Sequence, residues 1–209
     1  MKSMSLGGPM VIMVVGGPGV GKSFFAKRFA ETFNAPLVSN DKIRYTLFST
    51  HTYSKNENIM VDQVARLILD EILVGGKPIV LDGGYNTRSS REAISQLASQ
   101  YGFRTLIVWV QTDEGTARRR AENRSVKAPG DQYKQSLTPD QYDALEDAFT
   151  EPDIAVREKN TVVISGKHTY GAQAKTVLTK IVESRTDLAD ATKPINREDP
   201  HGRSIFPTI

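Results

Sequence analysis

The stretch Gly16-Gly17-Pro18-Gly19-Val20-Gly21-Lys22-Ser23 matches the phosphate-loop (Walker A) pattern G-x-x-x-x-G-K-[ST] at every fixed position. The residues before it, 10–15, are apolar and partly β-branched, which indicates a buried strand. After it, one apolar stripe recurs at helical spacing, formed by Phe25, Ala26, Phe29, Ala30 and Phe33. A strand, a glycine loop and a helix in this order predict a nucleotide-binding site.

The composition of the loop suits a triphosphate. Glycines lack a Cβ, so the backbone can adopt positive φ and let successive N–H groups converge on an anion at the start of the helix. We expect Lys22 to reach the β- and γ-phosphates and the Ser23 hydroxyl to coordinate Mg²⁺. The residues expected to bind the nucleotide here are Gly16, Gly17, Pro18, Gly19, Val20, Gly21, Lys22, Ser23 and Phe24. The loop alone does not separate a kinase from a GTPase or a motor ATPase.

Length and composition suit one globular domain. The chain has 209 residues, of which 39% are hydrophobic and 24% charged, and it has no cysteine, which excludes disulfides and thiolate metal sites. The net charge of +3 is too small to indicate nucleic-acid binding. No apolar run approaches the ~18 residues that a membrane span needs. We therefore expect a cytoplasmic protein with no membrane partner.

Strand and helix patterns alternate along the chain, which predicts a parallel α/β sheet. The expected strands are residues 10–15, 36–38, 78–81, 105–110 and 161–164. Residues 1–9 are predicted to be a flexible leader, 10–184 a single domain, and 185–209 an irregular polar tail.

Three helices have specific predicted faces or caps. The first has an inward face made by Val61, Val64, Ile68 and Ile72. The second begins with a capping box made by Ser89 and Glu92. The third begins at Thr138-Pro139 and turns inward Tyr142, Leu145 and Phe149.

The segment 113–137 is rich in arginine and poor in aliphatic residues. Four arginines, Arg118, Arg119, Arg120 and Arg124, lie on its helical part, and Pro129-Gly130 breaks it. A polar, arginine-rich helix followed by a loop is what a lid over phosphates needs. The alternative is a solvated helix with a surface loop.

Two carboxylates follow predicted strands, at the edge of the sheet where ligands bind. A helix beginning near Asn40 would put Asp41 and Arg44 on one face. Asp41 would then take the proton of an attacking hydroxyl, and Arg44 would hold a nearby phosphate or other anion. Asp82 ends the third strand beside the phosphate loop, where it would orient Mg²⁺ or hold the acceptor.

Together these motifs resemble the kinase domain of polynucleotide 5′-hydroxyl kinases and the related zeta-toxin-like group, from about Val11 to Pro152. The resemblance implies a three-layer P-loop kinase fold with a five-stranded parallel sheet in the order 2-3-1-4-5. It implies that Asp41 is the general base, that Arg44 contacts the acceptor, that Arg124 stabilises the transferring phosphoryl group and that Arg120 lies towards the nucleotide. Many relatives read Asp-x-Thr-Asn after the third strand, whereas this chain reads 82–86 as Asp-Gly-Gly-Tyr-Asn.

The predicted function is transfer of the γ-phosphate of ATP, with Mg²⁺, to a hydroxyl. The expected catalytic residues are Lys22, Asp41, Arg44 and Arg124, and the expected metal ligands are Ser23 and Asp82. The acceptor stays open, with a slight preference for a nucleic-acid 5′-end, whose phosphates Arg88, Arg91 and Lys55 would line. The alternative is a small molecule such as a nucleoside, sugar nucleotide or antibiotic. A GTPase is a weaker alternative, because the fourth strand is not followed by Asn-Lys-x-Asp, and so is a plain ATPase module. The sequence does not predict an oligomeric state.

Overall fold

The computed structural model describes residues 6–124 and 133–191, with side chains through residue 184. Its centre is a parallel sheet in the order β2-β3-β1-β4-β5, which confirms the expected order. The strands are β1 (Met10–Val15), β2 (Leu37–Ser39), β3 (Ile79–Asp82), β4 (Arg104–Gln111) and β5 (Thr161–Ser165). In the central strand, Met13 pairs with Leu81 of β3 and with Ile107 of β4.

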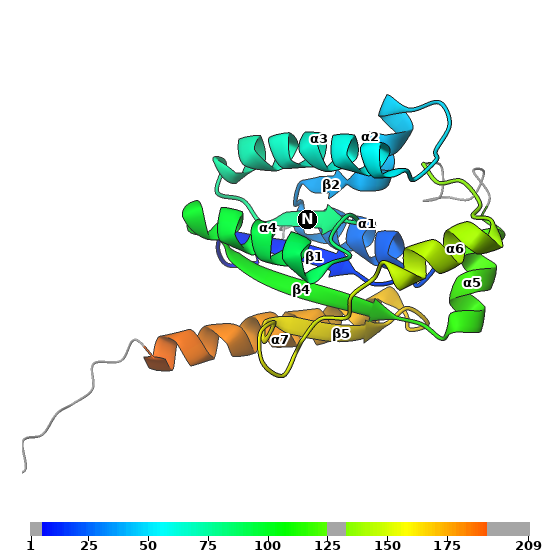
Figure 1. Ribbon diagram of the computed structural model, residues 1–209. Coiled ribbons are helices and arrows are strands. Elements are labelled where there is room, and N and C mark those ends of the chain that lie inside the picture. Colours follow the sequence, from blue (N-terminus) through cyan, green and yellow to red (C-terminus); the bar gives the residue numbers. More distant parts are fainter. Residues whose placement is uncertain (1–5, 125–132, 192–209) are drawn as a thin grey trace, which may run out of the picture.

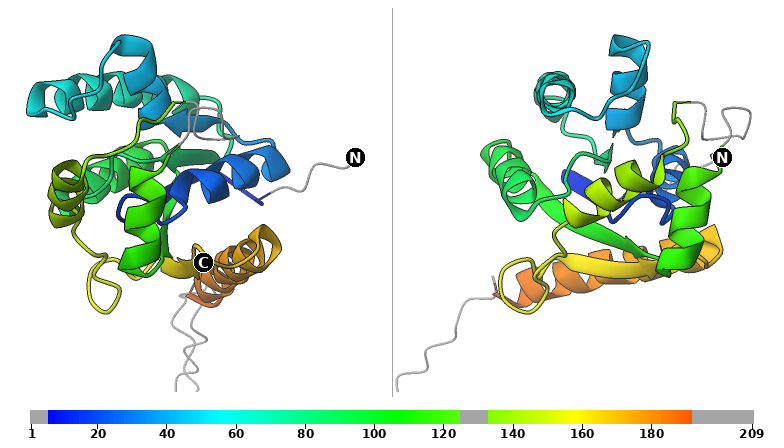
Figure 2. Two further views of the ribbon diagram at one scale, coloured as in Figure 1. Left: turned by 90° about the vertical axis from the view of Figure 1, so that its right-hand side faces the viewer. Right: turned by 45° about the vertical axis from the view of Figure 1, so that its right-hand side comes forward.

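Helices cover both faces of the sheet, and Figure 2 shows the sheet between the two helical layers. They are α1 (Lys22–Phe33), α2 (Asn40–Leu47), α3 (Lys55–Leu73), α4 (Arg88–Gln100), α5 (Glu114–Glu122), α6 (Pro139–Asp147) and α7 (Tyr170–Ala191). Helices α1 and α7 pack on one face, and α3 and α4 on the other. Helices α5 and α6 lie at the end of the sheet to which β4 and β5 point (Figure 1). That end is therefore where residues from the whole chain can meet.

The core follows from the alternation of strand side chains. In β1, Ile12 and Val14 join the cluster under α1 and α7, whereas Val11, Met13 and Val15 join the cluster under α3 and α4. Every residue of β1 is buried, as expected for the central strand of a sheet covered on both faces.

The inward face of α3 differs from the prediction. Val61 is buried as expected, and Val64 and Ile72 are partly buried against the same cluster, but Ile68 is exposed. The fully buried residues of the face are Val61 with Ala65, Leu69 and Leu73. The helix carries apolar residues over a stripe wider than one face, so two registers fit its sequence. In the observed one, Ala65 is among the buried residues.

The start of α4 also differs, whereas α6 starts as predicted. The N-cap of α4 is Thr87, in a reciprocal capping box with Ser90, so the predicted box of Ser89 with Glu92 is wrong. Glu92 instead accepts from Arg88 at 2.7 Å on the exposed surface. In α6, Thr138 is the N-cap, and Tyr142 is the buried residue of the helix.

Both ends of the chain are more ordered than expected. Leu6 is buried in the cluster under α1 and α7, and Pro9 accepts a hydrogen bond from the backbone of Arg104, so the leader does not extend through residue 9. Helix α7 continues to Ala191, past the expected boundary at residue 184. Leucine and alanine in this last stretch favour the helix despite its polar neighbours. Most of the expected leader and tail, residues 1–5 and 192–209, lies outside the described residues. No helix in the described part of the chain is long and apolar enough to cross a membrane.

Candidate active site

The phosphate loop joins β1 to α1 in a conformation that requires glycine. Gly16, Gly19 and Gly21 have φ of 141°, 77° and 108°. A Cβ on Gly19 would also lie 1.9 Å from the carbonyl oxygen of Ala117 in α5. Glycine at these positions therefore sets the turn and lets α5 pack directly on the loop.

Lys22 lies over the loop. Its Nζ donates to the carbonyl oxygens of Gly16 at 2.7 Å and Gly17 at 2.5 Å. Burial and the nearby Lys134 lower the pKa of Lys22 to about 8, although the carboxylates of Asp82 and Asp41 oppose this. A bound phosphate would place a negative counter-charge beside this ammonium group. The position of Lys22 is therefore consistent with its predicted role.

Ser23 and Asp82 lie together, as the metal prediction requires. The Ser23 hydroxyl donates to Oδ1 of Asp82 at 3.0 Å, and the Ser39 hydroxyl donates to Oδ2 at 3.4 Å. Burial raises the pKa of Asp82, and Asp41 adds to this, although Lys134 opposes it. A hydroxyl and a carboxylate are oxygen ligands that suit Mg²⁺.

The fit to a metal depends on the nucleotide. Within residues 6–124 and 133–191, no group of three or more His, Cys, Asp or Glu side chains is placed to hold a metal ion. A Mg²⁺ ion bound by Ser23 and Asp82 would therefore take its other ligands from phosphates and water, as is usual for this ion.

Asp41 faces the phosphate loop. It lies in the first turn of α2, and its Oδ2 is 3.3 Å from Nζ of Lys134, which also donates to Oγ of Ser23 at 2.6 Å. One ammonium group thus spans the carboxylate and the loop. Burial alone would raise the pKa of Asp41, but Lys134, Arg124 and Lys22 outweigh it and lower the pKa, so the carboxylate is ionised at neutral pH.

Arg44 is placed differently from the prediction. Its guanidinium is buried, donates to Glu57 at 2.5 Å and to Asn58 at 2.8 Å, and stacks over the Tyr53 ring at 4.7 Å. These contacts make Arg44 a link between α2 and α3 rather than a side chain directed with Asp41 towards an acceptor. Tyr53 has a positive φ of 54°, which is uncommon for an aromatic residue.

The two arginines expected to act on the nucleotide contact different segments near the loop. Arg120 donates to the carbonyl of Gly166 at 3.3 Å, after β5. Arg124 donates to the carbonyl of Gln135 at 3.5 Å, and its charge acts on both Asp41 and Lys22. The roles that the resemblance implies for the two arginines stay predictions. The break predicted at Pro129-Gly130 lies outside the described residues.

Sequence reasoning missed Lys134. The residue stands in a polar stretch that matches no motif, and its only signal is its place inside the expected lid, 113–137. In the structure its side chain is 13% exposed and lies between Ser23 and Asp41.

A cavity of about 550 Å³ adjoins the loop at Gly17 and Val20, beside the carboxyl ends of β4 and β5. Trp109 and Phe149 form an apolar part of its wall, and the carboxylate of Glu146 lies close to Gly17. Burial raises the pKa of Glu146, although Lys22 opposes this. The cavity thus combines aromatic rings with acidic acceptors.

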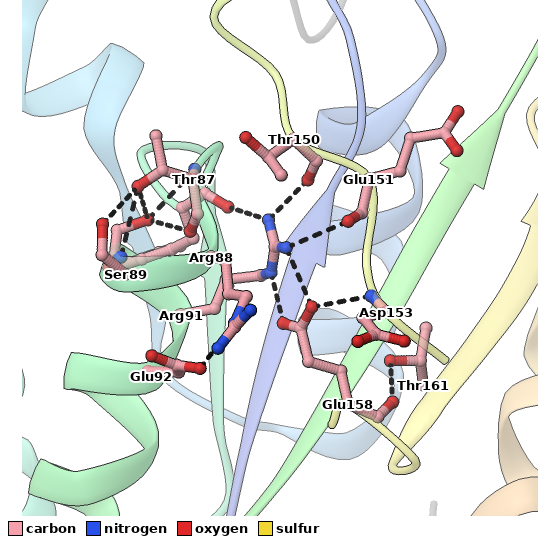
Figure 3. Close-up of polar contacts among 12 residues, drawn as sticks. Thr87, Arg88, Ser89, Arg91, Glu92, Thr150, Glu151, Asp153, Glu158 and Thr161 are labelled. Atoms are coloured by element: carbon pink, nitrogen blue, oxygen red, sulfur yellow. Dashed lines mark hydrogen bonds and ion pairs between the residues drawn. The ribbon is translucent and has the colours of Figure 1, made fainter. Parts of the chain in front are cut away.

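Arg91 does not line a phosphate site. Figure 3 shows its guanidinium enclosed by Glu158 and by backbone carbonyls of the segment after α6. It donates to both carboxylate oxygens of Glu158, at 2.6 and 3.0 Å, and to Thr150 at 2.9 Å. The residue is fully buried, so it anchors the segment after α6 to α4.

The fold is shared with solved structures of low sequence identity. A gluconokinase from Sinorhizobium meliloti 1021 has a TM-score of 0.64 and 15% identity, over 91% of this chain and 100% of that one. Kti12 from Chaetomium thermophilum, solved in complex with ADP-AlF3, has a TM-score of 0.60 and 18% identity, over 83% of this chain and 97% of that one. The chain therefore has the α/β P-loop fold of the kinase type.

No curated protein matches the sequence. A family model described as an AAA domain, AAA_33, matches residues 11–152, the same range that carries the resemblance noted in the sequence. It includes the phosphate loop and every residue discussed above between Lys22 and Phe149. The chain belongs to the AAA_33 family of P-loop domains.

Proposed function

We propose that this protein is an ATP-dependent kinase that transfers the γ-phosphate to a hydroxyl group. The observation that carries the proposal is the position of Asp41, an ionised carboxylate that shares the Lys134 ammonium with Ser23 of the phosphate loop. A nucleotide on the loop and a hydroxyl hydrogen-bonded to Asp41 would then face each other.

Phosphoryl transfer mainly requires that a protein position the two reactants and compensate the negative charge of the phosphates. Lys22 and Arg124 would compensate the charge of the phosphates, and Ser23 with Asp82 would hold Mg²⁺, which draws charge from the β- and γ-oxygens when bound. Because its pKa is lowered, Asp41 is a weak base. The main role of Asp41 would be to accept a hydrogen bond from the acceptor hydroxyl and so orient this hydroxyl. Asp41 would take the proton late in the phosphoryl transfer.

The nucleoside part of ATP would lie on the β4–β5 side of the loop. Arg120 reaches Gly166 there, and the cavity with Trp109 and Phe149 opens beside Gly17. The lining carries Asp113, Glu146 and Glu151 with one lysine, Lys167, and its carboxylates suit amino groups, as on an adenine.

A small-molecule acceptor fits the described residues best. The arginines that a nucleic-acid 5′-end would need are occupied, since Arg44 and Arg91 are buried against glutamates and Arg88 is paired with Glu92. The similar fold of a gluconokinase supports the same choice. A nucleic-acid 5′-hydroxyl is the second candidate, favoured by the resemblance of the loop, Asp41 and Arg124 to polynucleotide kinases. The expected setting is the cytoplasm.

The proposal is tested by transfer of radiolabelled phosphate from ATP or GTP. The acceptors are a panel of sugars, sugar acids, nucleosides and aminoglycosides, and 5′-hydroxyl DNA and RNA. We expect label on one acceptor class, and none when EDTA removes Mg²⁺.

Asp41→Asn should lower turnover on the order of 10²-fold or more while the affinity for ATP changes only a few-fold, because the carboxylate acts on the acceptor. Asp140→Asn is the matched control, since Asp140 is an exposed aspartate in the first turn of α6. Turnover of the Asp41 variant at the wild-type rate would show that the base is misassigned.

A further inference from the structure

Lys134 occupies the space between the two halves of the site. Its Nζ is 2.6 Å from Oγ of Ser23, on the nucleotide side, and 3.3 Å from Oδ2 of Asp41, on the acceptor side. The side chain is largely buried, and its charge acts on Lys22, Asp41 and Asp82. No other described residue makes both of these contacts.

This position lies on the route of the transferred group. If ATP lies on the loop and the acceptor hydroxyl lies on Asp41, the phosphoryl group crosses from the Ser23 side to the Asp41 side. An ammonium that reaches both ends of this route is within reach of the group throughout the crossing.

We propose that Lys134 is a catalytic residue that binds the phosphoryl group in transit, an inference that rests on the proposed function. The bond from the γ-phosphorus to the β–γ bridging oxygen breaks, and its electrons leave with ADP. The bond from the phosphorus to the acceptor oxygen forms, and the hydroxyl proton passes to Asp41. Lys134 keeps its protons and stabilises the charge on the equatorial oxygens of the phosphoryl group.

The contacts of Lys22 explain why a second lysine is needed. Lys22 is held against the carbonyls of Gly16 and Gly17 in the loop. Lys134 comes from a different segment and approaches from the side of Asp41. Its charge therefore counts most in the transition state, as the phosphoryl group moves from ADP towards the acceptor oxygen, and this is the interaction that raises the rate.

The test compares wild type with Lys134→Met, which keeps the length of the side chain, and Lys134→Arg, which keeps its charge. Lys175→Met on the exposed side of α7 is the control. We expect Lys134→Met to lower kcat on the order of 10²- to 10³-fold, Lys134→Arg to recover part of the loss, and the control to match wild type.

A binding measurement gives a second readout that needs no acceptor. The affinities for ADP and for ADP with aluminium fluoride are measured by calorimetry. Aluminium fluoride is an analogue of the phosphoryl group in the transition state of transfer. Lys134→Met should bind ADP within a few-fold of wild type and bind the ADP–aluminium fluoride complex at least about ten-fold more weakly, because only the latter has a group for Lys134 to contact.

Two outcomes overturn the inference. One is an unchanged kcat together with unchanged affinity for ADP–aluminium fluoride. The other is tighter Mg²⁺-nucleotide binding and faster turnover in Lys134→Met, which would make the lysine a competitor of the metal. If wild type binds nucleotides but phosphorylates no acceptor, the proposed function fails, and the aluminium fluoride measurement still decides the role of Lys134.

Discussion

At the scale of single residues, the arginines show that sequence spacing alone does not predict the partner of a charged side chain. Their sequence positions predicted that Arg44 and Arg91 would contact phosphates. In the structure both are buried against glutamates, Glu57 and Glu158. Their partners come from other segments, so no local pattern reveals them. Lys22, Ser23, Asp41 and Asp82 do meet around the loop as predicted, because a phosphate loop and the ends of adjacent parallel strands fix their places.

The buried pair of Arg44 with Glu57 makes a prediction about acid. Burial alone would raise the pKa of Glu57, but hydrogen bonds from Thr52 and Arg44 outweigh it and lower the pKa to about 2 from its usual 4.5. A lowered pKa in the folded state contributes stability that is complete above about pH 4.5 and is lost as the pH falls towards 2.

Glu57→Gln should therefore lower the free energy of unfolding by about 3 kcal/mol at pH 7, since Arg44 is left buried without a counter-charge. It should also flatten the dependence of stability on pH between 4.5 and 2, measured by urea denaturation. Glu92→Gln, at an exposed pair, should change stability by less than about 1 kcal/mol. Equal acid sensitivity of wild type and Glu57→Gln would contradict the account.

At the scale of elements, the helices were predictable where one signal dominates. Helix α1 has a single apolar stripe after the glycine loop, and α6 has Thr138 with Pro139, and both form as expected. Helix α3 offers two overlapping apolar stripes, so its register is set by packing on the sheet, which the sequence of the helix alone does not contain.

Adjacent residues test the register of α3. Leu69 is fully buried and Ile68 is 36% exposed. Leu69→Ala should lower the free energy of unfolding by about 3 kcal/mol, because it leaves a cavity under the helix. Ile68→Ala should cost less than about 1 kcal/mol. The measurement is chemical denaturation of both variants, and a larger loss for Ile68→Ala than for Leu69→Ala would contradict the observed register.

At the scale of the whole molecule, the parallel sheet and the edge that carries the site followed from the sequence patterns, and the strand order followed from the family resemblance. The contacts made by residues 133–137 did not, because they depend on where a polar segment returns across the sheet. The same holds for the acceptor side, where the guanidinium of Arg44 is bound to Glu57 and Asn58. A local sequence pattern specifies the loop that binds phosphates. The acceptor side of the site, opposite this loop, is instead shaped by tertiary packing.

Nucleotide binding should stabilise the whole domain. Burial lowers the pKa of Lys22 to about 8 from 10.5, so its charge costs the folded state stability below about pH 8, and stability recovers as the pH rises from 8 to 10.5. ATP at 100 times its Kd should add about 2.7 kcal/mol, which raises Tm by about 5–10 °C.

Lys22→Met should abolish this shift, while its own Tm without nucleotide at pH 7 is equal to or above that of wild type. Lys27→Met, on the exposed side of α1, should keep both Tm values. Differential scanning calorimetry at pH 7 gives all of them. A full ATP shift in Lys22→Met would remove this lysine from the nucleotide site.

The wall of the cavity beside Gly17 also has a practical consequence. Trp109 is the sole tryptophan of the chain, and it lines that cavity with Phe149. Its indole emission, excited selectively over the tyrosines, comes from one known place next to the phosphate loop. The unlabelled protein thus contains its own optical sensor, and occupancy of the β4–β5 side can be titrated by fluorescence without an attached dye.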